Sequence, residues 1–223
     1  MTSAVDVANM ALSHIGAESQ VESLDPPDGS AEAGYCARFL PIARRIAIES
    51  QSWTFAKKRA TLAQIDNPST AWAYAYALPS DHINPVRVLN QAALQSALLW
   101  VDTLWLTPNT PDYWRALLEN TEQASALYEI EGQTLLTHEP DAVLIYLRDV
   151  TDVNSWSPMF TSAVAQLLAG YLAGPIIKGM EGMRVGKAWT DSGMAMLSRA
   201  AASDANATSE RAEFVPHTIL ARA

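Results

Sequence analysis

The chain has 223 residues, which is enough for one large domain or two small ones with their own core. Hydrophobic residues make up 49% of it and charged residues only 17%, against about a quarter in a typical globular chain. Either much of the surface is buried against other copies or partners, or the chain has a dense monomeric core. The net charge is -9 and the largest basic cluster is Lys57-Lys58-Arg59, which argues against a DNA-binding module because such modules carry a basic patch.

The N-terminal quarter predicts two helices. Residues 4–15 form the first, and Gly16 ends it. A turn over residues 25–29 follows, and Ser30 caps a longer second helix that Pro41 interrupts. Cys36, the only cysteine, lies on this helix and is interpreted as buried and structural rather than nucleophilic. Because no second cysteine is present, the simpler expectation is a reducing compartment, and the N-terminus has no pattern of a secretory signal.

The middle of the chain predicts strands. Alternating or β-branched patterns mark six segments: residues 55–65, 72–78, 86–89, 127–131, 134–137 and 143–150. Large and small residues alternate around Trp72, Tyr74 and Tyr76; these aromatic residues favour a packed sheet face over a base-stacking site, because no Lys or Arg lies between Arg59 and Arg87. The stretch from about 90 to 126 shows no clear pattern.

The last part of the chain returns to helix, after Pro158 and again over residues 181–202. Residues 153–177 carry no charge over the length of a membrane span, but Gln166 lies in the middle and small polar residues are frequent. We therefore expect no membrane span, but a helix buried on all sides, with its small face against a neighbouring helix or subunit.

Helices at both ends and strands in the middle predict an α+β fold: a helical bundle from the N- and C-terminal helices plus a central antiparallel β lobe. The expected boundaries are 1–52 and 153–202 for the bundle, 53–152 for the β-rich lobe with an insertion at about 90–126, and 203–223 for a C-terminal tail.

Motifs of known chemistry are not found in the sequence. Gly186-Lys187 lacks the remaining positions of a phosphate-binding loop, and the glycines at 179, 182, 186 and 193 are interpreted as loosening a helix or letting neighbours approach closely. The four histidines are far apart in sequence, and no zinc spacing or nucleophile elbow is present. The expectation is a protein that is not an enzyme and that has no catalytic, cofactor or metal site.

Several blocks keep one order along the chain, and together they resemble the tail tubular protein A family of short-tailed bacteriophages, the head-to-tail adaptor. The resemblance covers roughly residues 5–175. The blocks are Asn9 to Gly16, Ser52 to Leu62, Tyr76 to Asp81, Tyr128 to Gly132, Leu135 to Thr137, Tyr146 to Asp152 and Trp156 to Phe160. No family block is found from about 90 to 126, and the last helix and tail match only loosely.

The resemblance implies a non-enzymatic virion protein at the head-tail junction, assembled in the host cytoplasm. It would form a ring of twelve copies between the portal and a tail nozzle of the tubular protein B kind. Double-stranded DNA would pass through without specific binding, which the acidic balance suits.

Three sets of contact residues are expected on this basis. The apolar residues of the tail would dock on the portal, although a frayed tail is the alternative, and the tryptophans of the insertion would face the nozzle. Small residues of the uncharged helix would contact other subunits. The sets are Phe214, Val215, Ile219 and Leu220; Trp100, Trp105 and Trp114; and Ala163, Gln166, Gly170 and Gly174.

A second hypothesis is a monomeric or dimeric α+β domain that binds a small ligand, with the tryptophans lining a pocket. It predicts a small particle and a saturable site.

Overall fold

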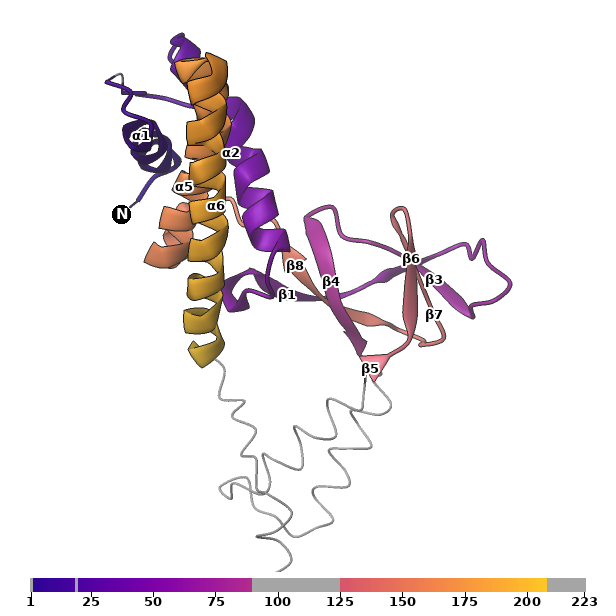
Figure 1. Ribbon diagram of the computed structural model, residues 1–223. Helices are drawn as coiled ribbons and strands as arrows, with labels where there is room; N and C mark the ends of the chain where they lie inside the picture. The colour runs from indigo at the N-terminus through magenta and orange to yellow at the C-terminus, as the bar shows by residue number, and fades with distance from the viewer. Residues whose placement is uncertain (1, 19, 90–124, 208–223) are drawn as a thin grey trace, which may run out of the picture.

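The computed structural model describes residues 2–18, 20–89 and 125–207, and within these ranges the fold is α+β, as predicted. A helical bundle stands beside two antiparallel sheets (Figure 1). Two of the predicted contact sets, the tryptophans Trp100, Trp105 and Trp114 and the tail residues Phe214, Val215, Ile219 and Leu220, lie outside the described residues.

The four long helices of the described chain are α1 (Ala4–His14), α2 (Ala31–Glu49), α5 (Pro158–Ile177) and α6 (Gly179–Asp204). Three begin at a serine whose side chain accepts a hydrogen bond from a backbone N–H of the first turn: Ser3, Ser30 and Ser157. Pro41 lies inside α2 without ending it. Short 3₁₀ turns, Thr54–Ala56, Val153–Ser155 and Ala205–Ala207, connect or extend these helices.

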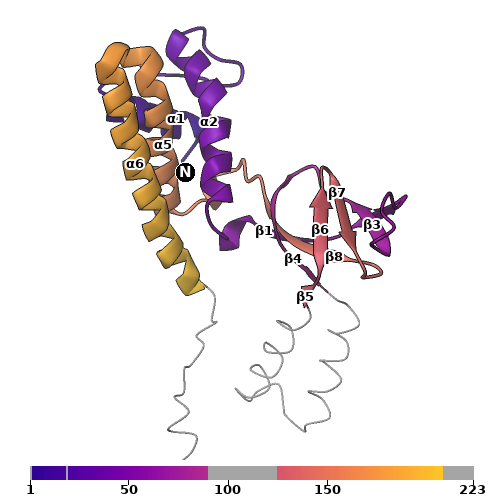
Figure 2. The same ribbon diagram turned by 45° about the vertical axis from the view of Figure 1, so that its right-hand side comes forward.

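Helix α5 forms the centre of the bundle, and α1, α2 and α6 pack against it (Figure 2). Its buried residues lie on every side, from Phe160 to Ala173, because the helix is apolar around its whole circumference. Its length and composition would allow it to cross a membrane, but the buried core helix of a soluble protein can have the same length and composition. The prediction of a helix buried on all sides is confirmed.

The sheets have four strands each, all antiparallel. The first has the order β1 (Lys57–Thr61), β8 (Val143–Arg148), β4 (His82–Leu89) and β5 (Ser125–Ala126). The second has the order β2 (Ala63–Ile65), β3 (Tyr74–Ala77), β7 (Thr134–Thr137) and β6 (Tyr128–Glu131). A core between them contains residues of both sheets, among them Tyr76, Leu135, Leu144 and Tyr146. Tyr74 packs against the same core, so the packed-face interpretation is confirmed for Tyr74 and Tyr76. Trp72 does not belong to this core; its ring lies against His138 and its Nε1 donates to Glu129.

Two predicted strands differ most from the observed ones. The segment 55–65 begins as a 3₁₀ turn and then divides into β1 and β2, which belong to different sheets. The chain changes sheet at Leu62, whose N–H donates to the Ala142 carbonyl rather than to a strand partner. Strand β4 begins four residues before the predicted Val86, because register shifts around Pro85 let a strand with a proline continue to pair.

Strand β8 joins the two cores. Leu144 and Tyr146 point into the core between the sheets, whereas Leu147 belongs to the core of the bundle. Successive side chains of a strand point to opposite faces, so a strand buried on both sides needs a continuous apolar run, as residues 143–147 provide. The β lobe is therefore attached to the bundle by its own central strand.

Candidate functional site: the junction of bundle and sheets and the exposed faces around it

An ion pair links α2 to the end of β8. The Arg44 guanidinium donates from Nε to Asp149 Oδ1 over 2.7 Å and from Nη2 to Asp149 Oδ2 over 2.8 Å. The side chains are only 14% and 24% exposed. Two parallel charge-assisted bonds fix orientation as well as distance, so this pair holds the sheets at a set angle to the bundle.

A second polar cluster lies on the sheet beside it. Lys58 Nζ donates to Asp81 Oδ2 over 2.8 Å, and the Tyr146 hydroxyl donates to Asp81 Oδ1 over 2.7 Å. Burial raises the pKa of Asp81, but the hydrogen bonds from Lys58 and Tyr146 outweigh it and leave that pKa lowered. The Asp81 carboxylate is therefore charged near neutral pH and bound on both oxygens, so it serves as a connector of strands.

Two buried tryptophans close the junction from the bundle side. Trp53 Nε1 donates to the Ala47 carbonyl over 2.8 Å, and Trp156 Nε1 donates to the Val150 carbonyl over 3.1 Å. Both indoles meet the ring of Phe160 edge-on, with centroids 4.9 Å and 5.2 Å away. Each indole thus satisfies its N–H while its rings fill the core, as buried tryptophans require.

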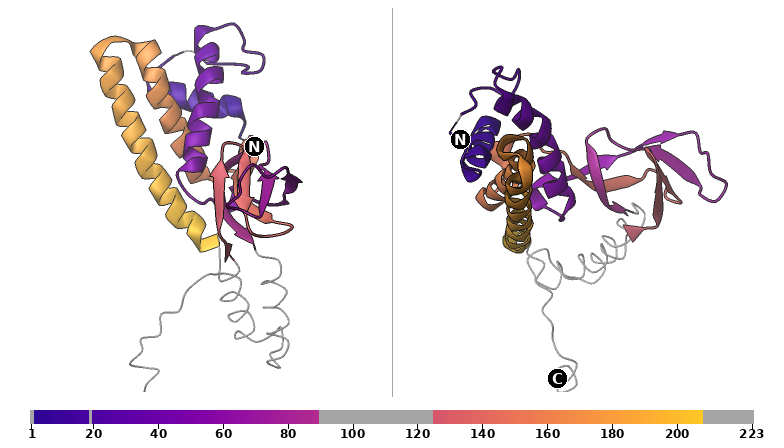
Figure 3. Two further views of the ribbon diagram at one scale, coloured as in Figure 1. Left: turned by 90° about the vertical axis from the view of Figure 1, so that its right-hand side faces the viewer. Right: turned by 45° about the horizontal axis from the view of Figure 1, so that its top comes forward.

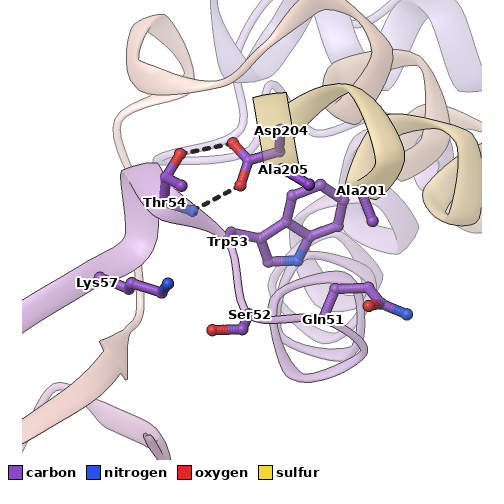
Figure 4. A pocket seen from close by; sticks show the side chains of 8 residues that line it. All are labelled: Gln51, Ser52, Trp53, Thr54, Lys57, Ala201, Asp204 and Ala205. Atoms are coloured by element: carbon purple, nitrogen blue, oxygen red, sulfur yellow. Dashed lines mark hydrogen bonds between the residues drawn. The ribbon is translucent and has the colours of Figure 1, made fainter. Parts of the chain in front are cut away.

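A small pocket lies where the end of α2, the first 3₁₀ turn and the end of α6 meet (Figure 4). Asp204 lies on its wall and accepts hydrogen bonds from Thr54 N over 2.7 Å and from Thr54 Oγ1 over 2.6 Å. Lys57 also lines it. The cavity volume is about 230 Å³, below the roughly 300–1,000 Å³ of sites for drug-sized ligands.

The groups with potential reactivity are buried or separated. No group of three or more His, Cys, Asp or Glu within the described ranges is placed to hold a metal ion. Burial raises the pKa of the Cys36 thiol to about 11, and this side chain has no exposed surface, so it is protonated and inaccessible. His14 stacks on Trp189 with ring centroids 4.4 Å apart, and burial lowers its pKa.

Three of the four expected subunit-interface residues are buried or covered within the chain itself. Ala163 is fully buried, and Gln166, 8% exposed, accepts a hydrogen bond from Ser192 Oγ of α6 over 2.9 Å. Gly170 lies directly against Thr190 and Gly186 of α6. Gln166 and Gly170 therefore face the chain's own last helix and Ala163 is buried within the chain, which leaves the three positions little or no surface for another subunit. Gly174 is exposed, so its proposed contact stays a prediction.

Several features of the junction were not predicted from the sequence. Arg44 is separated from Asp149 by 105 residues and Thr54 from Asp204 by 150, and neither pair has a local pattern. The exposed methionines Met180, Met183 and Met194 on the outer side of α6 were not predicted either.

No model of a known protein family matches the chain, and no curated protein matches it.

Proposed function

We propose that the chain is a structural head-to-tail adaptor of a short-tailed bacteriophage. In this proposal, twelve copies form a ring between the portal of the capsid and the tail nozzle. The ring extends the channel through which double-stranded DNA passes without specific binding, and the chain catalyses no reaction.

The position of the ordered blocks is the observation that carries the proposal. Two strand-associated blocks contribute polar contacts here: the Tyr146 hydroxyl donates to Asp81, and Asp149 accepts from Arg44 of α2. On the bundle side, Trp53 and Trp156 donate to nearby backbone carbonyls. The Arg44–Asp149 pair joins the bundle to the sheet, and the other contacts fix the segments on either side of it. Such a framework is what a mechanical connector requires, because it must keep its geometry under load from both ends.

The two-body shape supports the same proposal. The bundle and the β lobe lie side by side and expose separate surfaces, so one chain can contact two different partners (Figure 1). We propose that the tail residues Phe214, Val215, Ile219 and Leu220 dock on the portal and that Trp100, Trp105 and Trp114 face the nozzle.

The proposal is tested by the mass of the purified chain, alone and mixed with its cognate portal ring. The expected result is a ring, formed either alone or on the portal. A variant shortened to residues 1–207 should lose portal binding, and it keeps Asp204, which binds Thr54 and so must not be removed.

A full-length monomer that ignores the portal would refute the adaptor proposal and favour the small-ligand domain instead. Alanine at Trp105 or Trp114 should weaken nozzle attachment, and unchanged attachment would refute the nozzle-facing assignment.

A further inference from the structure

A row of three basic side chains crosses the face of the first sheet that points away from the core between the sheets, the face whose Leu147 belongs to the core of the bundle. Arg59 of β1 and Arg87 of β4 are both direct cross-strand partners of Ile145 in β8, so the three side chains lie on one face with Ile145 in the middle. Lys57 lies two residues before Arg59 and therefore on the same face. Because neighbouring strands are about 4.8 Å apart, the two arginines are roughly 10 Å from each other. We call Lys57, Arg59 and Arg87 the basic row.

The basic row makes no ion pair within the described ranges, although Lys57 lines the same small pocket as Asp204. The ion pairs between described residues use Arg44, Lys58 and Arg184, and among these residues no hydrogen bond to a carboxylate involves the row. Lys57 and Arg59 are exposed and Arg87 is half-buried, whereas Ile145 between them is only 4% exposed. Three unneutralised cations close together on a chain of net charge -9 are an uncommon local excess. Such a row favours an anionic partner.

The opposite charge is concentrated in the loop between α1 and α2. Residues 1–37 contain no Lys or Arg, and their acidic residues are Asp6, Glu18, Glu22, Asp25, Asp28 and Glu32. Glu18, Glu22 and Asp25 have exposed side chains, and no cation pairs with them in the described part of the chain. We call these three the acidic loop.

The acidic loop is held in a fixed shape. Asp28 accepts hydrogen bonds from the backbone N–H of Glu22 over 2.8 Å and from the N–H and hydroxyl of Ser30 over 2.9 and 2.6 Å. The Asn9 side chain exchanges two hydrogen bonds with the backbone of Val21, of 2.9 and 2.8 Å. The three carboxylates therefore sit on an ordered backbone, which reduces the entropy lost when a partner binds.

The two charged surfaces cannot meet within one chain. The acidic loop ends where α2 begins, and the basic row follows after α2 ends, at the other end of the bundle (Figures 1 and 3). Helix α2 has 19 residues, which makes it about 28 Å long. At that distance the charges are screened from each other at physiological ionic strength, where the Debye length is about 8 Å.

We propose that the acidic loop of one copy of this chain docks on the basic row of the next copy. Each copy then offers one of each surface, which is the head-to-tail kind of contact that closes into a ring or continues as a filament. This inference rests on the proposed function, because it assigns the contact between subunits of the ring. It also replaces the small face of α5, which α6 already covers, as the expected surface between subunits.

The test uses charge reversal on each surface of the full-length chain. One variant carries Lys57→Glu, Arg59→Glu and Arg87→Glu, and the other carries Glu18→Lys, Glu22→Lys and Asp25→Lys. In each variant both surfaces have the same sign, so self-association measured by sedimentation velocity should weaken roughly a hundredfold or more. An equal mixture of the two should assemble again, with the variants alternating, and a chain carrying all six changes should assemble alone.

A matched control is Arg38→Glu, Arg45→Glu and Arg199→Glu, which changes the net charge as the first variant does but at exposed positions outside the basic row. It should assemble like the unmodified chain. The docking assignment is overturned if both reversal variants assemble as well as the unmodified chain. It is also overturned if the control variant assembles as poorly as the reversal variants. In both cases the adaptor proposal stands. An unmodified chain that stays monomeric at every concentration also overturns the docking assignment, and the portal experiment then decides the adaptor proposal separately. If the unmodified chain binds a DNA duplex, and the variant with the reversed basic row loses this binding but assembles normally, the basic row is a nucleic-acid site instead.

Discussion

Gly186→Ala should destabilise the protein, although the same change in an open helix would stabilise it. Gly182, Gly186 and Gly193 of α6 lie against α5 at close range. A Cβ added at Gly186 would be 2.8 Å from the carbonyl oxygen of Gly170. Ordinary contact begins at 3.4 Å, so the two helices would have to separate by about 0.6 Å. The obstructing atom belongs to the backbone and cannot rotate away.

Two effects of opposite sign determine how much Gly186→Ala changes the free energy of unfolding. Alanine is favoured over glycine by about 1 kcal/mol inside an unhindered helix. Overpacking costs about 1–3 kcal/mol, and a rigid backbone contact belongs at the upper end of this range. The expected net loss in the free energy of unfolding is therefore about 1–2 kcal/mol, or roughly 2–8 °C in Tm for a chain of this size.

Urea and thermal unfolding of two matched variants measure this difference. Gly34 lies inside α2 with no atom within 4 Å of an added Cβ, so Gly34→Ala should gain about 0.5–1 kcal/mol. Both variants add the same methyl group to a helix and differ only in what it meets. If Gly186→Ala raised the stability as much as Gly34→Ala does, the close α5–α6 contact would not exist as described.

Three further predictions concern other groups. A double-mutant cycle with alanine at Arg44, at Asp149 and at both positions should give a coupling energy of about 1–3 kcal/mol in urea unfolding, because the ion pair is bidentate and mostly buried. A coupling energy below about 0.5 kcal/mol would contradict this. Burial lowers the pKa of His14 and of His82, so the unfolded chain binds more protons than the folded chain below about pH 6.5, and the free energy of unfolding should fall from pH 7 to pH 5. The double variant His14→Phe, His82→Phe should show a smaller fall over this pH range. An unchanged fall would exclude these two histidines as its cause. The Cys36 thiol, with its pKa raised to about 11, should react with a disulfide reagent no faster than the chain unfolds, and rapid labelling of the native protein would show that the site is open.

The helices could be predicted from the sequence because their signals are local. Ser30 and Ser157 each accept a hydrogen bond from a backbone N–H three residues later, and Gly16 has the positive φ of 72° that ends a helix. The strand segment 55–65 could not be divided correctly, because its break at Leu62 depends on pairing with Ala142, far along the chain. A local pattern indicates that a segment is extended, but not to which sheet each part belongs.

The junction was beyond sequence reasoning for a different reason. Arg44 and Asp149 are single charged residues in elements whose other charges face solvent, and nothing in either segment indicates a partner. By contrast, the strand that carries the junction was predictable, since the apolar run from Val143 to Leu147 is typical of burial on both faces. Only a strand over residues 143–150 was predicted, and nothing in the sequence indicates what fixes its angle to the bundle.

The small residues of α5 show why a spacing pattern alone does not identify the helix that packs against it. Gly170 and Gly174 at helical spacing indicate a close approach of another backbone, but a helix of the same chain and a helix of a neighbouring subunit require the same spacing. The glycines of α6, at Gly182 and Gly186, supply the complementary surface within the chain. Since this face is already filled, contacts between copies must use surfaces that the single chain leaves uncovered. The basic row and the acidic loop satisfy that condition and have opposite charge, so reversing them tests the assembly at a place where the folded core is not altered.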